Sequence, residues 1–112
     1  KSYILKHEKG SMPSAILEIE IDGNLFKEIA NGDGQFNAFM NAIKKIYKRN
    51  LLDLPILIDY AVTIPPGSNS DSFCETLITW KKDEGEEFIT RGLDSDQTVS
   101  AIKATEKMLN II

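Results

Sequence analysis

Hydrophobic and polar residues alternate through much of the first half of the chain. In residues 15–21, leucine and isoleucine alternate with Glu18 and Glu20, so an extended chain would have one apolar and one charged face. Residues 2–5 form a short strand-like run before this segment. Residues 25–30 return after an Asp-Gly-Asn turn that is typical of a hairpin. The pattern therefore predicts three strands before the first helix.

The period then changes to that of a helix. After the sequence Gly-Asp-Gly, apolar residues recur at steps of three and four, which places them on one stripe of a helix. These residues are Phe36, Phe39, Met40, Ile43, Ile46 and Tyr47. Basic residues gather near the end of the segment, where they favour the negative pole of the helix dipole. We expect this helix to cover one face of the three strands.

The second half of the chain repeats this order. Residues 55–64, 72–82 and 87–91 are predicted to be strands, and an Asp-Glu-Gly turn joins the last two. One face of the first of these strands carries Ile56, Ile58, Tyr60, Val62 and Ile64. A helix follows residues 92–96. Its predicted apolar stripe consists of Thr98, Ile102, Thr105, Leu109 and Ile112.

The repeated order predicts the fold class. Two βββα units, covering about residues 1–50 and 51–112, make an α+β fold in which helices pack on antiparallel sheets. Gly32 of the first unit corresponds to Gly92 of the second, and two such copies usually pack about a pseudo-two-fold axis. Since each unit has three strands for one helix, we expect a sheet face to meet another protomer.

Composition narrows the classes of function. The 112 residues, 42% hydrophobic and 27% charged, suit a single soluble domain, residues 1–112, with a core of its own. A net charge of -4 disfavours a nucleic-acid partner. The lack of a long apolar run or signal-peptide pattern predicts no membrane segment. The single cysteine, Cys74, fits a reducing cytoplasm. Because the chain begins with Lys1, we expect it to be cut from a longer enzyme.

Candidate chemistry centres on the loop Gly32-Asp33-Gly34. Two glycines around an acid before a helix suit a tight turn that presents backbone N–H groups to a small polar ligand. The same pattern also makes an ordinary turn with a helix cap. In the second loop, Asp94 and Asp96 are interpreted as a helix cap rather than as paired catalytic carboxylates or a cation site. No catalytic residue and no cluster of metal ligands is identified.

Together these segments resemble a known family. The matching positions are residues 31–38 with Ala42, Asp59-Tyr60, Gly67, residues 92–96 and the Leu109-Asn110-Ile111 end. They make the chain similar to the C-terminal regulatory domain of the α-isopropylmalate synthase and citramalate synthase family. The resemblance runs from Ile29 to the end of the chain. It implies two βββα units that dimerise and carry the feedback-inhibitor site for leucine or isoleucine.

The resemblance also implies which residues bind the inhibitor. They are Gly32, Asp33, Gly34, Phe36, Asn37, Leu57, Tyr60, Ile64, Ser70, Leu93 and Ser95. The glycine loop would hold the amino and carboxylate groups, and the two later loops would close the pocket. Strict alternation places Leu57 on the face opposite Tyr60 and Ile64, so these three can line one pocket only if the strand bends, bulges or lies at an interface. Gln35 replaces a proline that is usual in the family, which leaves the loop less rigid.

The expected function is therefore allosteric. The domain would bind a branched-chain amino acid and regulate a Claisen-type acyltransferase through a homodimer and through the catalytic barrel of the same polypeptide. No cofactor is expected in this domain, whereas acetyl-CoA and a divalent metal would belong to the missing catalytic part. Because Phe36, Leu57 and Ile64 are bulky, isoleucine and citramalate synthase are favoured, with leucine and α-isopropylmalate synthase a close second. A methyl-sized difference is worth only ~1–3 kcal/mol of discrimination.

Two alternatives stay open. One is a dimerisation module of the same enzyme that has lost its ligand, which Gln35 and the bulky wall would support. The other is a free-standing amino-acid-binding domain of the ferredoxin-like kind. That fold needs the order βαββαβ, and the hairpin before each helix argues against it.

Overall fold

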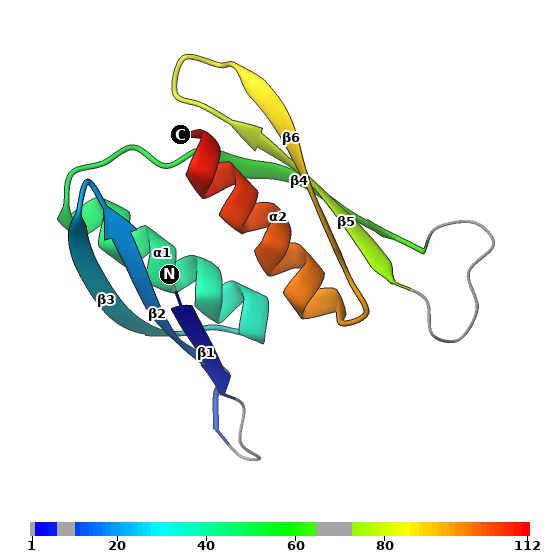
Figure 1. The fold of residues 1–112 in the computed structure, drawn as a ribbon, viewed down its shortest axis with the longest axis horizontal. Coiled ribbons are helices and arrows are strands. Elements are labelled where there is room, and N and C mark those ends of the chain that lie inside the picture. Colours follow the sequence, from blue (N-terminus) through cyan, green and yellow to red (C-terminus); the bar gives the residue numbers. More distant parts are fainter. Residues whose placement is uncertain (1, 7–10, 65–72) are drawn as a thin grey trace. The chain divides into compact units, whose positions relative to one another are not determined.

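The computed structural model describes residues 2–6, 11–64 and 73–112 and divides into two compact units, Lys1–Leu54 (unit 1) and Pro55–Ile112 (unit 2). Each unit is a three-stranded antiparallel sheet followed by one helix (Figure 1). The predicted α+β class with a repeated βββα unit is therefore confirmed. In the described part of the chain, neither helix is long and apolar enough to cross a membrane.

In unit 1, strands β1 (Ser2–Lys6), β2 (Ser14–Ile21) and β3 (Asn24–Asn31) lie in the order β1-β2-β3, and α1 (Gln35–Arg49) follows. The Asp-Gly pair that joins β2 to β3 has φ values of 51° and 80°. A two-residue type I′ turn requires such left-handed values at both central positions. The hairpin that the sequence predicts is therefore confirmed.

The alternation along β2 gives unit 1 its core. Ala15, Leu17 and Ile19 are at most 4% exposed and lie on the face that α1 covers. The buried residues of α1 are Ala38, Phe39, Met40, Ala42, Ile43, Ile46 and Tyr47. The predicted helical stripe is confirmed except at its first member, Phe36, which is only half-buried.

The opposite face of this sheet carries an apolar stripe. Ile4, Ile16 and Ile29 stand directly opposite one another across the three strands, and side chains paired in this way share a face. Ile4 and Ile29 are each 54% exposed. Contiguous exposed apolar side chains often mark an interface. The expectation that a sheet face meets another protomer stays a prediction.

In unit 2, strands β4 (Ile56–Thr63), β5 (Cys74–Lys81) and β6 (Glu87–Asp94) lie in the order β4-β5-β6, and α2 (Gln97–Ile111) follows. Strand β6 extends further than the sequence predicts. The segment Gly92-Leu93-Asp94 pairs with β5 instead of opening a loop. The loop before α2 is correspondingly short.

Unit 2 has a partly polar core. Trp80 and Ile78 are fully buried, and the Trp80 indole N–H donates to Thr90 Oγ1 at 2.8 Å. The hydroxyl oxygens of Thr76 and Ser100 are 2.6 Å apart. Because Ser100 donates its only hydroxyl proton to the carbonyl three residues before it, Thr76 is the donor in that bond. In the part of the chain that the structure describes, every buried side-chain nitrogen and oxygen has a partner.

The buried side of α2 differs from the predicted stripe. Its buried residues are mostly small, and they are Ser100, Ala101, Ile102, Ala104, Thr105 and Met108. Of the predicted stripe only Ile102 and Thr105 are buried. The cause is Gly92, where a Cβ would overlap the carbonyl oxygen of Ser100 and lie 2.7 Å from the backbone nitrogen of Ala104. The helix approaches the strand so closely that small side chains fill this contact.

Strand β4 contains a β-bulge. The register with β5 shifts between Leu57 and Asp59, which adds one residue to β4 at that point. Leu57 is opposite Trp80 and Tyr60 is opposite Ile78, and both partners are buried residues of the face that α2 covers. Leu57 and Tyr60 therefore share one face. A bulge is one of the solutions that the sequence left open for this strand.

Candidate functional site

The loop between β3 and α1 contains the first predicted site residues. Gly32 donates its N–H to the Pro13 carbonyl at 3.1 Å, and Asp33 donates its N–H to Asn37 Oδ1 at 3.0 Å. Gly34 is the N-cap of α1 and has an extended backbone with φ of -143°. Two of the loop amides that the sequence predicts to face a ligand therefore already have acceptors within unit 1.

The two glycines of this loop have different roles. At Gly32 a Cβ would overlap the backbone nitrogen of Ala38 and lie 2.5 Å from Asn37 Oδ1. At Gly34 a Cβ would meet nothing within 4 Å. Glycine is thus needed at the first position so that the helix can close on the strand, whereas the second position tolerates a side chain.

The electrostatics of the loop suit a small zwitterion. Helix α1 has no side-chain cap at its start and no acidic residue in its first turn. The first N–H groups of a helix lack intrahelical acceptors and form the positive end of the dipole, so a carboxylate is stabilised there. Asp33 is exposed beside this helix end and takes part in none of the ion pairs found among the described residues. Its carboxylate can bind an ammonium group.

Side chains of α1 hold the edge of β3 and the loop together. Asn41, Lys45 and Arg49, four residues apart, donate to alternate carbonyl oxygens of β3 at 3.0, 3.0 and 3.5 Å. Asn41 Nδ2 also donates to Asn37 Oδ1 at 3.3 Å. Because β3 is an edge strand, these bonds occupy acceptors that another strand could otherwise use. Sequence reasoning missed Asn41, although its polar side chain stands one turn after Asn37 in an apolar helical pattern.

Phe36 brings an apolar side chain to the start of α1. Its ring stacks on Phe39 with centroids 6.4 Å apart and planes at 22°. Phe39 in turn meets the Tyr3 ring edge-on at 5.5 Å. This aromatic cluster anchors the first turn of α1 on the sheet, three residues from Asp33.

Unit 2 contains the other predicted site residues. Leu57 is half-buried and Tyr60 is 37% exposed on the face of the sheet that α2 covers. Ile64 follows the end of β4 and is 67% exposed. The predicted contact Ser70 and the motif residue Gly67 lie outside the described residues.

Leu93 and Ser95 do not join Leu57 and Tyr60 on that face. Leu93 is opposite Glu75, a position of β5 that alternates with the buried residue Thr76, so Leu93 lies on the face away from α2 and is 47% exposed. The predicted place of Leu93 in a loop was wrong, because β6 continues to pair with β5 there. Ser95 is exposed between β6 and α2.

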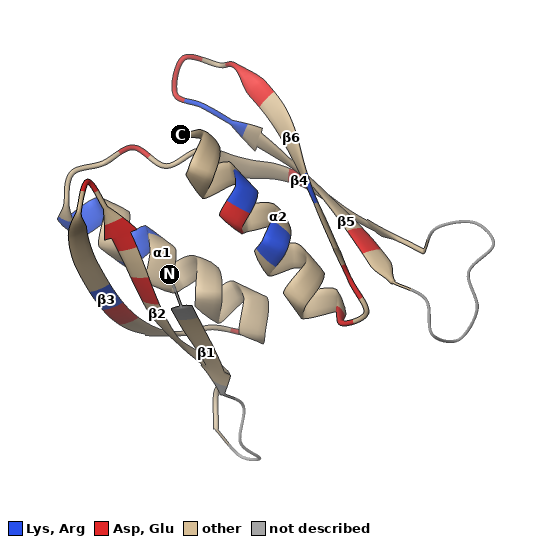
Figure 2. Cartoon of the chain, in the orientation of Figure 1, with Lys and Arg blue, Asp and Glu red and all other residues tan. Residues whose placement is uncertain are grey.

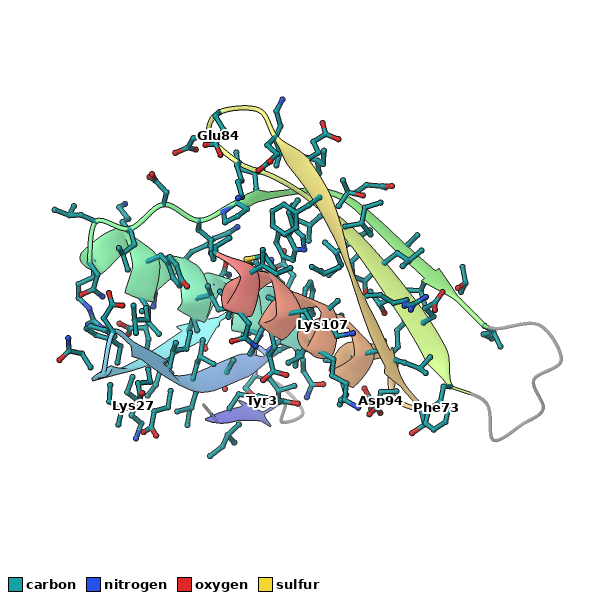
Figure 3. All side chains as sticks on the ribbon, turned by 45° about the horizontal axis from the view of Figure 1, so that its top comes forward. Tyr3, Lys27, Phe73, Glu84, Asp94 and Lys107 are labelled. Atoms are coloured by element: carbon teal, nitrogen blue, oxygen red, sulfur yellow. The ribbon has the colours of Figure 1, made fainter. Side chains whose placement is uncertain are left out.

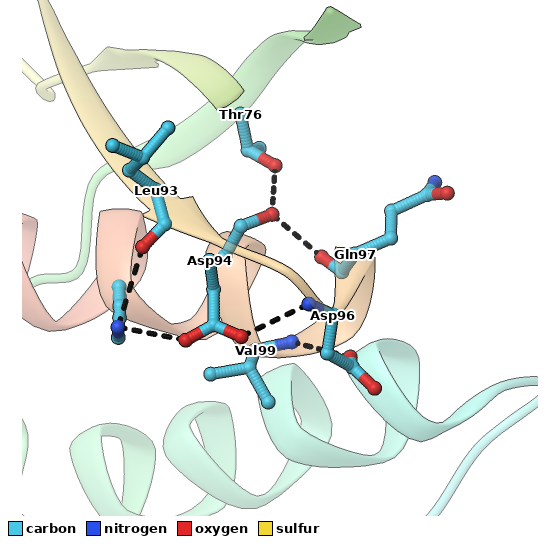
Figure 4. A network of polar contacts seen from close by, with 8 residues as sticks. Thr76, Leu93, Asp94, Asp96, Gln97 and Val99 are labelled. Atoms are coloured by element: carbon cyan, nitrogen blue, oxygen red, sulfur yellow. Dashed lines mark hydrogen bonds and ion pairs between the residues drawn. The ribbon is translucent and has the colours of Figure 1, made fainter. Parts of the chain in front are cut away.

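The short loop between β6 and α2 contains a charged network (Figure 4). Asp94 Oδ1 accepts the Asp96 N–H at 2.9 Å, and Asp94 Oδ2 accepts Lys103 Nζ at 2.8 Å. Lys103 Nζ also donates to the Leu93 carbonyl at 3.3 Å. Asp96 is the N-cap of α2, since its Oδ1 accepts the Val99 N–H at 3.0 Å. The predicted helix cap is confirmed at Asp96.

The same network explains the titration of Asp94. The hydrogen bond from Lys103 is the largest cause of a lowered Asp94 pKa, and the Asp96 N–H adds to it. In unit 2, the Asp94 carboxylate is therefore already paired with the Lys103 ammonium group. Among the residues that the structure describes, there is no group of three or more His, Cys, Asp and Glu side chains that could hold a metal ion.

Acidic side chains gather at both ends of β6 (Figure 2). They are Asp83, Glu84, Glu86 and Glu87 near its start and Asp94 and Asp96 near its end. Figure 3 shows Glu84 and Asp94 at these opposite ends, with Lys107 between them on α2. At the first end, Glu86 pairs with Lys82 at 3.2 Å in an exposed contact, which contributes little to stability. At the second end, Asp94 accepts hydrogen bonds from both Lys103 and the Asp96 N–H.

Fold and loops together define a duplicated βββα domain in which each helix begins beside a polar loop. A sequence model of the LeuA allosteric (dimerisation) domain matches residues 1–112. The chain belongs to the LeuA allosteric (dimerisation) domain family.

Three relatives are 2-isopropylmalate synthases. The chain is 31% identical over 102 residues to the protein of Listeria innocua serovar 6a, which covers 89% of this chain and 19% of that protein. It is 35% identical over 97 residues to the protein of Methylorubrum populi, with coverages of 86% and 17%. For Listeria monocytogenes serotype 4a the identity is 30% over 101 residues, with coverages of 89% and 19%. The chain thus spans less than a fifth of the length of these relatives.

Proposed function

We propose that this chain is the allosteric domain of an acyltransferase of branched-chain amino-acid biosynthesis and that it binds a branched-chain amino acid as a feedback inhibitor. Family membership supports the class of function. The observation that carries the ligand class is the β3–α1 loop, where Asp33 stands beside a helix start without a side-chain cap. An amino acid is a zwitterion, and this loop offers one group for each charge.

The proposed binding mode follows from the hydrogen bonds of the loop. Since the Gly32 and Asp33 amides already donate within unit 1, the ligand carboxylate uses the N-terminal end of α1. The ligand ammonium pairs with the Asp33 carboxylate, and Phe36 borders the aliphatic side chain. Leu57 and Tyr60 are the proposed apolar contacts of unit 2, where the bulge places both on one face of the sheet.

The proposed parent enzyme is a 2-isopropylmalate synthase, the name that the three relatives carry. Citramalate synthase is the alternative. The catalytic barrel, with acetyl-CoA and a divalent metal, would belong to the rest of the polypeptide, and two copies of the domain would form a homodimer. With 2-isopropylmalate synthase as the parent, the effector that the family resemblance pairs with it is leucine. Isoleucine, which the bulk of Phe36, Leu57 and Ile64 favours, is the competing ligand.

Regulation of the enzyme requires differential affinity. An amino acid shifts the activity only if it binds one arrangement of the regulatory dimer more tightly than another. The difference between its binding free energies to the two arrangements sets the largest possible shift. If the amino acid changes the affinity for a substrate of the catalytic part, that substrate changes the affinity for the amino acid by the same factor.

Thermal unfolding of the 112-residue chain tests the proposal. An effector at 100 times its Kd stabilises the folded state by about 2.7 kcal/mol, which raises the midpoint by roughly 10 °C. Leucine and isoleucine are compared with D-leucine, which has the same apolar surface but the wrong arrangement around Cα. Absence of any shift with either natural amino acid would contradict a ligand role.

A pair of acidic variants tests the proposed mode. Asp33→Asn removes the partner of the ammonium and should weaken leucine binding by about tenfold or more, since a charge-assisted hydrogen bond is lost. Asp22→Asn, in the β2–β3 turn, is the matched control because asparagine also tolerates the positive φ of that position. Calorimetry that finds equal affinities for both variants would rule out Asp33 as the ammonium site.

A ligand-free dimerisation module is the second candidate. The internally bonded amides of Gly32 and Asp33 and the apolar stripe of Ile4, Ile16 and Ile29, whose two outer members are exposed, favour it. It predicts a dimer in sedimentation experiments whose unfolding midpoint does not respond to leucine or isoleucine. A dimer that also responds to one of them supports the allosteric domain instead.

A further inference from the structure

The seventh residue of each helix makes the same pair of contacts in the two units. In unit 1 it is Asn41, which donates to the Asn31 carbonyl at 3.0 Å and to Asn37 Oδ1 at 3.3 Å. In unit 2 it is Lys103, which donates to the carbonyl of Leu93 at 3.3 Å and to Asp94 Oδ2 at 2.8 Å. Each of these residues thus binds a carbonyl at the end of the preceding strand and a side-chain oxygen beside the loop. That oxygen belongs to Asn37 in the first turn of α1 and to Asp94 at the end of β6.

Those acceptors hold the backbone of the loop in turn. Asn37 Oδ1 accepts the Asp33 N–H at 3.0 Å, and Asp94 Oδ1 accepts the Asp96 N–H at 2.9 Å. A chain of two hydrogen bonds therefore runs from the seventh helical residue to a loop amide in both units. We call this arrangement the loop latch, formed by Asn41 and Asn37 in unit 1 and by Lys103 and Asp94 in unit 2.

The loop latch of unit 1 packs closely against the backbone at Gly32. A Cβ at Gly32 would lie 2.5 Å from Asn37 Oδ1, so the Asn37 side chain is packed against the loop that it holds. Asn37 is exposed and Asn41 is half-buried. Because Asn41 also bonds to the Asn31 carbonyl, it links the Asn37 amide to strand β3.

We propose that Asn41 is a positioning residue for the effector site, holding Asn37 and through it the Asp33 backbone in the shape that receives the ligand. The inference rests on the proposed function, because it assumes that the ligand ammonium binds Asp33. A loop that is already ordered before binding loses less conformational entropy when the ligand arrives. Removal of the latch should therefore weaken binding without removing any group that touches the ligand.

The chemistry of the two latches explains why the neutral one belongs to the ligand loop. In unit 2 the Lys103 ammonium is bound to Asp94, which occupies the carboxylate of that loop. An ammonium at position 41 would bring a positive charge beside the loop that contains Asp33. Asn41 donates hydrogen bonds without bringing a positive charge, so Asp33 keeps its negative potential.

Calorimetric titration with leucine and with isoleucine tests this role on three chains. Asn41→Leu has the same number of side-chain heavy atoms and the same branching but no donor, and we expect about a tenfold loss of affinity. Lys45→Met is the matched control, because Lys45 stands one turn further on and donates at 3.0 Å to a carbonyl of the same strand without reaching the loop. Its affinity should stay within about twofold of the unchanged chain, because an exposed contact of this kind contributes little.

Amide hydrogen exchange separates the latch from general stability. Exchange of the Asp33 N–H should become faster in Asn41→Leu and not in Lys45→Met, because opening of the Asn37 bond exposes that amide. Asn41→Gln, which keeps the donors, should restore part of the affinity and of the protection. If Asn41→Leu does not fold, Asn41→Gln is compared with Asn41→Glu instead. Glutamate has the same length as glutamine but no hydrogen-bond donor at its end.

The outcomes are distinct. If the unchanged chain binds an amino acid and Asn41→Leu binds it equally well with normal Asp33 protection, the positioning role is overturned and the proposed function stands. If the unchanged chain binds neither amino acid, the proposed function fails and takes the positioning role with it. In that case faster Asp33 exchange in Asn41→Leu would still show that the latch orders the loop.

Discussion

Unit 1 and unit 2 share one βββα arrangement but complete the start of their helices in different ways. Helix α1 has Gly34 as its N-cap and therefore no side-chain cap, and its loop is held by the neutral side chains of Asn37 and Asn41. Helix α2 begins at Asp96, which caps it, and its loop contains an ion pair. The loop of unit 2 thus satisfies itself, while that of unit 1 leaves a helix end and a carboxylate for something else.

The cores differ in the same direction. The buried side chains of unit 1 form an apolar cluster around Phe39 and Ile43, whereas the buried polar residues of the described chain all belong to unit 2. These are Thr76, Thr90, Ser100 and Thr105. Polar pairs in a core impose one geometry, because each donor needs its acceptor. Unit 2 therefore depends more on individual contacts, and unit 1 more on shape and volume.

The largest expected effect is at the contact between helix and strand in unit 2. Gly92→Ala places a Cβ on the Ser100 carbonyl and close to the Ala104 nitrogen, and backbone atoms cannot rotate out of the way. We expect a loss of about 3 kcal/mol or more in the free energy of unfolding, at the upper end of overpacking costs. Urea denaturation with a fluorescence signal from Trp80 measures it.

The two loop glycines of unit 1, Gly32 and Gly34, provide a comparison for the stability cost at Gly92. Gly32→Ala should also destabilise, since its Cβ would overlap the Ala38 nitrogen. Gly34→Ala meets nothing within 4 Å, so it should cost only the N-cap preference for glycine over alanine, at most about 1 kcal/mol. If Gly34→Ala cost as much as Gly92→Ala, close approach would not explain why glycine stands at these positions.

A smaller effect is expected in the polar core. Thr90→Val leaves the buried Trp80 N–H without the acceptor that it has at 2.8 Å, which costs about 1–3 kcal/mol. In unit 1, Ile43→Val removes one methyl group from an apolar site and should cost about 0.5–1.5 kcal/mol. The same urea titrations compare the two, and the near-ultraviolet dichroism of Trp80 should change only in Thr90→Val.

The helix caps provide the next comparison. Asp96→Ala removes the acceptor of the Val99 N–H and should lower the free energy of unfolding by about 1 kcal/mol. Gly34→Ser adds a side-chain cap to α1 and should raise the free energy of unfolding by roughly a few tenths of a kcal/mol. Thermal melts measure both. A stabilised Gly34→Ser chain with weaker leucine binding would show that the uncapped start of α1 is reserved for the ligand.

Much of the fold could be predicted because it depends on local periodicity. The alternation in β2 and the three- and four-residue steps in α1 identify both elements and their buried faces without any knowledge of distant contacts. The stripe of α2 was wrong because Gly92, five residues before that helix, sets how closely it packs. Helical spacing alone does not show how close α2 lies to β6, so the prediction selected the larger side chains.

The site was less predictable for a similar reason. The Gly32-Asp33-Gly34 loop was found from its sequence, but the partners of its amides are Pro13, far away in the chain, and the Asn37 side chain. The bulge in β4 could be named only as one of several solutions, since the sequence does not show which residue lacks a partner. The latch residues Asn41 and Lys103 become visible only when each helix is numbered from its observed start.

The smallest expected effect concerns the charged latch of unit 2. The hydrogen bond from Lys103 lowers the pKa of Asp94 from its ordinary value of 3.8, so the ionised carboxylate is favoured in the folded state. This contribution to stability is complete above the unfolded-state pKa and is lost as the pH falls through the lower folded-state pKa. Since Asp94 is only half-buried, screening by solvent keeps the gain small. A carbon-detected titration of the Asp94 carboxyl between about pH 2 and 6 should show its midpoint moving up towards the ordinary value in Lys103→Met.

Asn41→Leu, which breaks the neutral latch, is the control and should leave the Asp94 midpoint unchanged. An Asp94 titration insensitive to Lys103→Met would remove the electrostatic distinction between the two units.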